Sequence, residues 1–239
     1  MREIAEQRRR FGSPRIVRML HREGWADNHK RIERLYGEEG LSLRIRRRKK
    51  HAASARVPLP IPTEANQAWS MDFVWDYLRD GRRIKMLTIV DDFTRECLAI
   101  EVSFGLNGKR VAQVLDRLIE MRGKVTGIRS DNGPEFAGNA MDGWAYAKGV
   151  RLDFIRPGKP NENAFIESFN GRLRDECLND NQFVTLIEAQ TIIETWRMDY
   201  NDVRPHSSLD GLTPTEFAER HNSMLRCSNG IPRTQFTTA

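Results

Sequence analysis

The sequence has few of the residues that mark disulfide-bonded or zinc-binding proteins. Its three cysteines, Cys97, Cys177 and Cys227, lie far apart and form no CxxC pair. This spacing argues against a zinc site built on cysteine pairs and is typical of reduced thiols in a cytosolic protein. The five histidines have no metal-ligand spacing either, so a histidine metal site is not expected.

Long apolar runs are also absent. No stretch approaches the roughly 18 residues that span a membrane, and the N-terminal residues lack the hydrophobic segment of a signal peptide. The chain contains no internal repeat and no low-complexity segment. We therefore expect a cytoplasmic protein with no membrane partner, and its 239 residues suit one sizeable core plus a smaller module.

Positive charge is concentrated at the N-terminal end of the chain. Residues 1–56 contain 17 Lys and Arg against 7 Asp and Glu, whereas the remaining residues contain 22 against 26. A charged face that serves only solubility normally mixes the two signs more evenly. A basic head on a mildly acidic body therefore favours a polyanionic partner, and nucleic acid is the first candidate.

Two short helices are predicted in the basic head. Residues 13–23 begin with Ser13 as the helix N-cap and Pro14 at the first helical position. After a turn at Gly24, a second helix runs over residues 29–38. Its exposed cations are Lys30, Arg31 and Arg34. Two short helices around a glycine-containing turn are typical of a DNA-binding helix-turn-helix, although a small packing or dimerisation hairpin has the same pattern.

A basic run follows these helices and ends in Arg46, Arg47, Arg48, Lys49 and Lys50. Such a run suits contacts to DNA phosphates with release of counterions, although in a flexible segment it can also stay solvated. Residues 51–67 carry three prolines and are predicted to form a stiff, extended linker. We therefore divide the chain into a DNA-binding segment (1–50), a linker (51–67), an α/β core (68–180) and a helical extension (181–239).

From residue 68 the hydrophobic pattern is that of an α/β domain. Period-two alternation in residues 69–75 places four large apolar side chains on one face of a strand and Asp72 on the other. The first three strands are expected to form an antiparallel meander, and right-handed crossovers place the fourth strand beside the first. The expected strands are 69–75, 82–90, 96–104, 125–130 and 151–155, and the expected helices are 107–123, 135–148, 161–177 and 186–200, with a short helix after Pro214.

Three carboxylates occupy positions in or beside the predicted core. Asp72 lies within a central strand, Asp131 at the end of the strand predicted beside it, and Glu167 in the first turns of a helix. A single aspartate in such a place is more often a cap or an ion-pair partner, but three converging carboxylates repel one another unless a cation neutralises them. Carboxylates and substrate phosphates are typical Mg²⁺ ligands, and two such ions about 3.5–4 Å apart serve phosphodiester chemistry.

The sequence around these carboxylates resembles a known family. Its motifs are Trp69–Phe73 (WSMDF), Ser130–Phe136 (SDNGPEF) and the helix from residue 163 to 176. Together they resemble the DDE core that bacterial insertion-sequence transposases share with retroviral integrases. Asp131 and Glu167 have 35 residues between them, the spacing that characterises this family, and Arg174 matches its basic residue seven positions after the glutamate. Residues 11–50 and 200–214 resemble the family too, so the similarity covers nearly the whole chain.

The resemblance implies an RNase H-like fold, a mixed five-stranded sheet flanked by helices and preceded by a small helix-turn-helix module. It implies that Asp72, Asp131 and Glu167 are catalytic and bind two Mg²⁺ ions, for which Mn²⁺ can substitute. The implied activity is cleavage at insertion-sequence ends by water and then attack of the freed 3′-hydroxyl on target DNA, without a covalent protein–DNA intermediate.

The resemblance also implies partners. These are the terminal inverted repeats and target DNA, further copies of the chain in a synaptic complex, and an upstream-frame portion joined by programmed frameshifting, with the protein associated with the nucleoid. Near the three carboxylates, Arg174 is predicted to contact a DNA phosphate rather than pair with Glu167. Asn163 and Asn170 are predicted to contact DNA or to order waters, and Lys159 either contacts DNA or is solvated.

Structural roles are predicted for Asp91, Asp92, His206 and Glu135, the last as the start of a helix, and Asp76 is predicted to be a solvated carboxylate. Two other functions stay open. One is a DNA-binding regulator of the element that does not cleave, which the intact set of carboxylates argues against. The other is a metal-dependent nuclease that never joins DNA ends.

Overall fold

A computed structural model describes residues 1–43, 62–156 and 163–228 of the chain. The predicted basic run that includes Arg46, Arg47, Arg48, Lys49 and Lys50 lies outside the described residues, as does most of the predicted linker. Lys159 lies outside them as well. The predictions for these positions therefore stay predictions.

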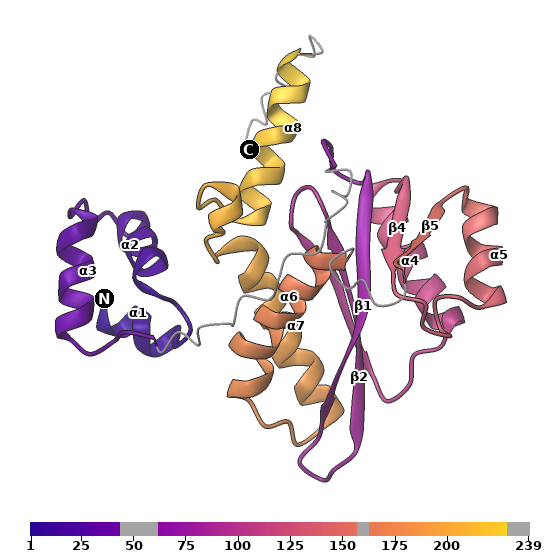
Figure 1. The fold of residues 1–239 in the computed structure, drawn as a ribbon, viewed down its shortest axis with the longest axis horizontal. Coiled ribbons are helices and arrows are strands. Elements are labelled where there is room, and N and C mark those ends of the chain that lie inside the picture. Colours follow the sequence, from indigo (N-terminus) through magenta and orange to yellow (C-terminus); the bar gives the residue numbers. More distant parts are fainter. Residues whose placement is uncertain (44–61, 157–162, 229–239) are drawn as a thin grey trace, which may run out of the picture.

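A mixed five-stranded sheet forms the centre of the molecule (Figure 1). Its order is β3-β2-β1-β4-β5, in which β1 to β3 form the predicted antiparallel meander and β4 and β5 run parallel to β1. The strands are β1 (Ala68–Tyr77), β2 (Arg83–Asp91), β3 (Cys97–Ser103), β4 (Gly127–Ser130) and β5 (Arg151–Phe154). The expectation that the fourth strand lies beside the first is confirmed, and this pairing brings Asp72 and Asp131 to neighbouring strands.

Helices cover both faces of this sheet, as Figure 1 shows. Helices α4 (Gly108–Arg122) and α5 (Asn139–Lys148) pack on one face, over a core that includes Trp69, Met71 and Phe73 of β1. Helices α6 (Ala164–Glu176) and α7 (Leu186–Asp202) pack on the other face, where Val74 of β1 is buried. The period-two alternation of β1 is therefore what turns Asp72 toward α6.

Two helix boundaries differ from the sequence predictions. Helix α5 begins at Asn139 rather than at Glu135, because Asn132–Gly138 forms a turn in which the amides of Phe136 and Ala137 donate to the carbonyl of Gly133. Glu135 is therefore not a helix-start residue, and its carboxylate pairs with Lys85. The last helix, α8 (Pro214–Ser228), is 15 residues long rather than short.

The head is a small helical unit with its own core. It contains α2 (Ser13–Arg22), α3 (His29–Glu38) and a short helix that periodicity did not predict, α1 (Arg2–Gln7). Ile16 and Ile32 are among its buried residues. The prediction that Ser13 caps α2 is wrong, because Gly12 is the N-cap and Ser13 is the first residue of the helix. Asn28 does cap α3, and its side chain accepts a hydrogen bond from the amide of Lys30 at 3.0 Å.

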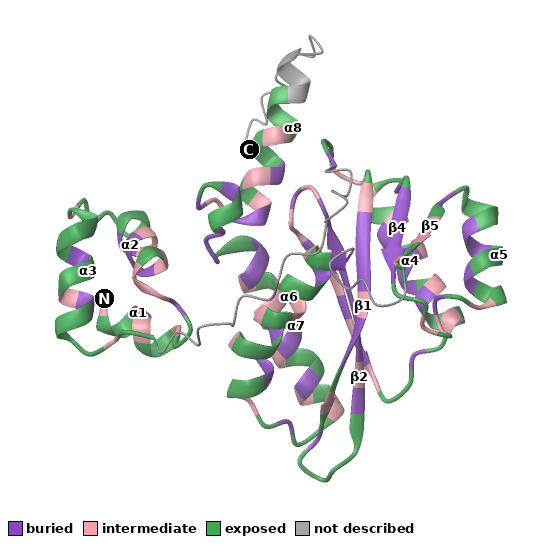
Figure 2. Cartoon of the chain, viewed as in Figure 1, coloured by how far each residue is buried: buried purple, intermediate pink, exposed green. Residues whose placement is uncertain are grey.

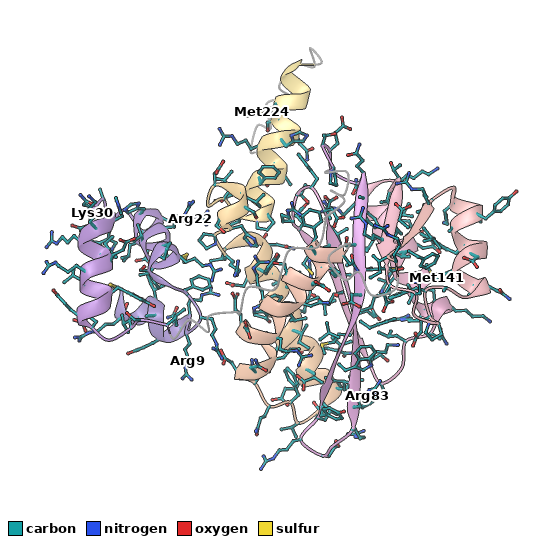
Figure 3. All side chains as sticks on the ribbon, in the orientation of Figure 1. Arg9, Arg22, Lys30, Arg83, Met141 and Met224 are labelled. Carbon is teal, nitrogen blue, oxygen red and sulfur yellow. The ribbon has the colours of Figure 1, made fainter. Side chains whose placement is uncertain are left out.

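The two helices of the head face different surroundings. Arg22 of α2 binds Glu216 of α8 at 2.5 Å, and Arg8 binds Asp199 of α7 through both guanidinium nitrogens. Lys30 of α3 lies on the side of the head that faces away from the body (Figure 3), and most of α3 is exposed (Figure 2). Helix α2 therefore docks the head on the body, and the basic surface of α3 stays open.

None of the helices within the described ranges combines the length and the apolar character that crossing a bilayer would require. Cys97 and Cys177 are buried free thiols.

The buried ring of His206 gives a prediction for stability at low pH. Its side chain is 3% exposed, packs edge-on against Tyr200, and has a pKa lowered to about 3 by burial and by the positive charge of Arg204. The unfolded chain takes up this proton near pH 6.5 and the folded protein does not, so stability decreases as the pH falls below about 6.5. This residue should contribute up to about 1.4 kcal/mol of lost stability per pH unit.

Urea unfolding of the wild type and of His206→Phe between pH 4.5 and 7.5 checks this expectation. The phenylalanine keeps a ring against Tyr200 but cannot be protonated, so its stability should depend less steeply on pH. His29→Gln on exposed α3 is the control and should keep the wild-type profile. A His206→Phe profile parallel to that of the wild type would show that this histidine does not cause the acid sensitivity.

Candidate active site

Asp72 is held in one orientation by its own strand and by α6. Its Oδ1 accepts a hydrogen bond from the amide of Phe73 at 2.7 Å, and its Oδ2 accepts one from Nδ2 of Asn170 at 2.8 Å. The Oδ1 of Asn170 in turn accepts a hydrogen bond from Oγ1 of Thr88 at 2.9 Å. Thr88 lies directly opposite Asp72 in the β1–β2 register. This chain of hydrogen bonds leaves the Asp72 side chain little freedom to rotate.

Asp131 follows the last residue of β4. In the parallel register Ser70 of β1 pairs with Arg129 of β4, so continuing that register by two residues brings Asp131 opposite Asp72. Its Oδ1 accepts a hydrogen bond from the amide of Gly133 at 3.0 Å, and the rest of the side chain is exposed. The strand end therefore delivers a second carboxylate to the edge where Asp72 lies.

Glu167 lies in the first turn of α6 and is exposed. Burial raises the pKa of Asp72 to about 6, and the negative charges of Asp131 and Glu167 add to this rise. The end of β4 and the first turn of α6 are thus close enough for the charges of Asp131 and Glu167 to act on Asp72.

The donor set suits a hard divalent cation, because it consists of carboxylate oxygens only. Across residues 1–43, 62–156 and 163–228, no three Asp, Glu, His or Cys side chains are close enough to hold a metal ion as they stand. Charges act on one another over longer distances than a metal–ligand bond spans. The separation of the three carboxylates therefore agrees with the raised pKa of Asp72. Asp131 and Glu167 are the exposed members of the set, so their side chains have room to turn toward Asp72.

The other predicted DNA contacts on α6 have different surroundings. Asn163 is 4% exposed and donates to the carbonyl of Met71 at 3.4 Å, so its burial argues against a direct contact with DNA. Asn170 points at Asp72 rather than outward. Arg174 is exposed, and its Nη2 donates to the carbonyl of Trp75 on β1 at 3.1 Å. Of these three residues, Arg174 is the one whose position suits a phosphate contact.

A cleft of about 740 Å³ lies between the head and α6. The head contributes Arg10, Arg15 and Leu43, and α6 contributes residues that include Glu167, Ser168 and Arg172. Burial and the neighbouring Arg204 lower the pKa of Arg15 to about 10. Sequence reasoning missed this cleft, because hydrophobic periodicity shows which face of a helix is apolar and not where a separate unit docks.

Several acidic residues near the site have the structural roles predicted for them. The Oδ1 of Asp91 accepts hydrogen bonds from the amides of Phe93 and Thr94, both at 2.9 Å, and so stabilises the turn after β2. Asp92 is fully buried and pairs with Arg129 at 3.0 Å. Burial raises the pKa of Asp92 to about 6, against the opposing influence of Ser70 and that arginine.

Family models match nearly all of the chain. A model described as an HTH-like domain matches residues 1–50, and two models described as integrase core domains match residues 62–160 and 148–214. Among relatives, the chain is 51% identical to a 31.7 kDa protein of insertion element IS407 from Burkholderia multivorans, over 92% of this chain and 80% of that protein. It is 28% identical to the transposase of insertion sequence element IS904 from Lactococcus lactis, over 91% of this chain and 90% of that one.

Solved structures support the fold. The chain superposes on a protein of the simian T-cell lymphotropic virus intasome with a TM-score of 0.63 and 15% identity, over 96% of this chain and 76% of that one. It superposes on the HTLV-2 integrase catalytic core domain, solved in complex with magnesium, with a TM-score of 0.53 and 16% identity, over 65% of this chain and 98% of that one. At these identities the likeness concerns the fold, and it agrees with the predicted integrase-like sheet.

Proposed function

This chain belongs to the bacterial insertion-sequence transposases with an integrase-like core, and from that premise we propose its reaction and its site. The proposed reaction is metal-dependent cleavage of DNA at the ends of the element, followed by attack of the freed 3′-hydroxyl on target DNA. The observation that supports the proposal is that Asp131, just after the strand beside β1, and Glu167 of α6 lie near enough to Asp72 for their charges to raise its pKa.

The same three carboxylates would hold the divalent metal. Their all-oxygen donor set supports Mg²⁺, with Mn²⁺ as a substitute, and a likeness in fold to an integrase core solved with magnesium supports the same ion. Two bound ions would neutralise the carboxylates and stabilise the charge that develops on the phosphate during displacement.

The chain's own residues orient the site. Asn170 and Thr88 keep Oδ2 of Asp72 pointed toward α6. The Asp72 side chain is therefore already restricted before a metal binds, so it loses less conformational entropy on binding. Arg174, at the exposed rim beside β1, would bind a DNA phosphate near the reacting bond. Arg10 and Arg172 would add cationic contacts along the cleft between the head and α6, where Arg15 already pairs with Glu176 at 3.6 Å.

Element ends, target DNA and further copies of the chain are the partners that we propose. The HTH-like match supports DNA binding by the head, and an upstream-frame portion of the transposase is proposed from the family resemblance alone. In this assignment the exposed α3, with Lys30, Arg31 and Arg34, contacts DNA, while α2 is occupied by the body.

A single DNA assay tests the proposed reaction. The protein, alone and with any upstream-frame partner, is incubated with duplexes that end in the element's terminal repeats, in Mg²⁺ or Mn²⁺. Joined products are the expected result. Nicked products without joining would replace the proposal with a nuclease, and binding without cleavage would replace it with a regulator.

The basic surface of α3 gives a prediction for the affinity of DNA binding. The triple variant Lys30→Gln, Arg31→Gln, Arg34→Gln should bind DNA more weakly and reduce the slope of log affinity against log salt by up to about 3, because each phosphate contact releases counterions. Fluorescence anisotropy between 50 and 300 mM salt measures both quantities.

The matched control for this variant removes the same number of charges elsewhere. Three exposed lysines lie on the face of the sheet away from α6: Lys109 in α4, Lys124 in the segment between α4 and β4, and Lys148 in α5. Changing all three to Gln should leave the salt slope within experimental error. Equal losses in the two triple variants would mean that net charge, rather than α3, controls binding.

A further inference from the structure

One short turn contacts all three segments that carry the proposed metal ligands. This turn, residues 91–95, joins β2 to β3 and holds its shape through hydrogen bonds to the side chain of Asp91. The amide of Arg95 donates to the carbonyl of Asp91 at 2.9 Å, and the φ angle of Arg95 is 64°. A non-glycine residue at such an angle has to be held by its surroundings.

The first contact of the turn is with β1. The amide of Asp92 donates to the carbonyl of Ala68 at 3.0 Å, and Oδ2 of Asp91 accepts a hydrogen bond from the amide of Asn66 at 2.7 Å. Ser70 lies on the same face of β1 as Asp72 and is fully buried. The hydroxyl of Ser70 and Oδ1 of Asp92 are both buried and have no hydrogen-bond partner among the described residues, so the link to β1 is the hydrogen bond from Asp92 to Ala68.

The second contact is with β4. Nη1 of Arg129 lies 3.0 Å from Oδ2 of Asp92, and both residues are buried, Arg129 with 8% and Asp92 with 0% of its surface exposed. Arg129 lies on the same face of β4 as Asp131, two positions earlier. A buried ion pair thus joins the turn to the strand that ends in the second carboxylate.

The third contact is with α6. The guanidinium of Arg95 lies over the ring of Phe165, 3.7 Å from its centroid, which is a close cation–π contact. Phe165 is two residues before Glu167, in the same first turn of the helix. Because a helical turn is rigid, a fixed Phe165 also fixes where the backbone of Glu167 lies.

The contact points lie close to the carboxylates in sequence. Arg129 and Phe165 each lie two residues before a proposed ligand, and Ala68 lies four residues before Asp72. We propose that the turn of residues 91–95, through Asp92 and Arg95, positions the three carboxylates for metal binding. Asp92 and Arg95 are positioning residues and touch neither metal nor DNA. This inference rests on the proposed function, since it assigns a support to the proposed metal site.

The physical reason is the mutual repulsion of the ligands. Three carboxylates tend to move apart before a cation arrives, and they lie on two strands and a helix that are separate in sequence. Holding all three segments from one turn lowers the cost of bringing the ligands together. Without the Asp92 carboxylate, Arg129 would be left as a buried unpaired cation, and the end of β4 would have to shift to solvate it.

The test uses the full chain and Mn²⁺ as the probe. Isothermal titration calorimetry gives the Mn²⁺ affinity of the wild type and of Asp92→Asn, and DNA cleavage is followed against Mn²⁺ concentration. We expect the Mn²⁺ affinity of Asp92→Asn to fall about tenfold or more, in the range that supporting residues of metal sites show. Half-maximal cleavage should move to a correspondingly higher Mn²⁺ concentration, while DNA binding through the head is unchanged.

Glu96→Gln is the matched control. Glu96 follows the same turn and forms a partly buried pair with Arg122, which contacts none of the three ligand-bearing segments through that pair. Its loss should change the Mn²⁺ affinity less than twofold. If Asp92→Asn does not fold, as judged by circular dichroism, Arg95→Gln replaces it, since Arg95 is only partly buried. That variant should weaken Mn²⁺ binding about threefold or more.

The outcomes separate the two proposals. Suppose that the wild type cleaves DNA and that a folded Asp92→Asn or Arg95→Gln binds Mn²⁺ as tightly as the wild type does. This result overturns the positioning role and leaves the proposed function intact. A similar loss in Glu96→Gln overturns it as well, because any disturbance of this region would then suffice. A wild type that neither binds Mn²⁺ nor cleaves DNA overturns the proposed function and the positioning role together.

Discussion

Changing Asp72 or Asp131 to Asn, or Glu167 to Gln, is expected to reduce DNA cleavage and strand transfer by a factor on the order of 10³ or more. Each change keeps the size of the side chain but removes a negative oxygen ligand, so the metal that stabilises the charge on the phosphate is lost. Cleavage and joining on duplexes that carry the element ends measure the loss, and anisotropy at constant salt should show DNA binding largely unchanged.

Asp76→Asn is the matched control for these variants. Asp76 lies on β1 with Asp72, and its Oδ1 accepts a hydrogen bond from the amide of Tyr77 at 2.8 Å. The same carboxylate-to-amide change there should leave cleavage within about twofold of the wild type. Cleavage that survives in any one of the three site variants would remove that residue from the proposed set of ligands.

Folding stability gives an independent readout for Asp72→Asn. Burial raises the pKa of Asp72 to about 6, which means that the folded protein disfavours the charged form of this carboxyl. A neutral amide at this position should therefore not lower the free energy of unfolding in metal-free buffer. An inactive Asp72→Asn with unchanged stability is the combination that a ligand role predicts, whereas a purely structural role predicts loss of both.

The second large effect is expected at Asn170. Asn170→Ala removes the donor to Oδ2 of Asp72 and the acceptor for Thr88, so the Asp72 carboxylate can turn away from the position that metal binding needs. Residues that orient metal ligands typically change affinity or activity by about 10–100-fold, and we expect a loss of that size in cleavage at low metal concentration. Raising the Mn²⁺ concentration should recover part of the rate.

Two further variants test this assignment. Thr88→Val keeps the shape of the side chain but removes one hydrogen bond of the chain, so its loss should be smaller than that of Asn170→Ala. Asn179→Ala changes an exposed asparagine beyond the end of α6 and should leave the metal dependence unaltered. If Asn170→Ala required no more metal than the wild type, the link from Asn170 to the site would be only structural.

The placement of the head bears on how DNA would reach this site. Arg8, just after α1, and Arg22 of α2 bind acidic side chains of the body, whereas α3 is exposed on the side of the head away from the body (Figure 3). A duplex held by α3 would therefore lie at a set distance from Glu167, because the head is tied to α7 and α8. The excess of positive charge in the sequence does not distinguish among the cations of the head, and the contacts divide them into a docking group and an open group.

Local patterns in the sequence were sufficient for most of the architecture. Alternation in residues 69–75 predicted β1 and the face that carries Asp72, and apolar spacing predicted α4 and α7. The family spacing of Asp131 and Glu167 predicted the integrase-like core that the matches with known proteins support. These features are local or linear in the chain, so the residues by themselves determine them.

Tertiary structure decided what depends on residues far apart in sequence. The turn after Asn132 delays the start of α5, because its backbone hydrogen bonds and the pairing of Glu135 with Lys85 outweigh helix propensity. Asn163 and Asn170 were candidates for DNA contact from the sequence, and packing of α6 on β1 turns both toward the strand. Side chains with both donors and acceptors take their role from the partner that folding brings near, and no pattern along the chain contains that information.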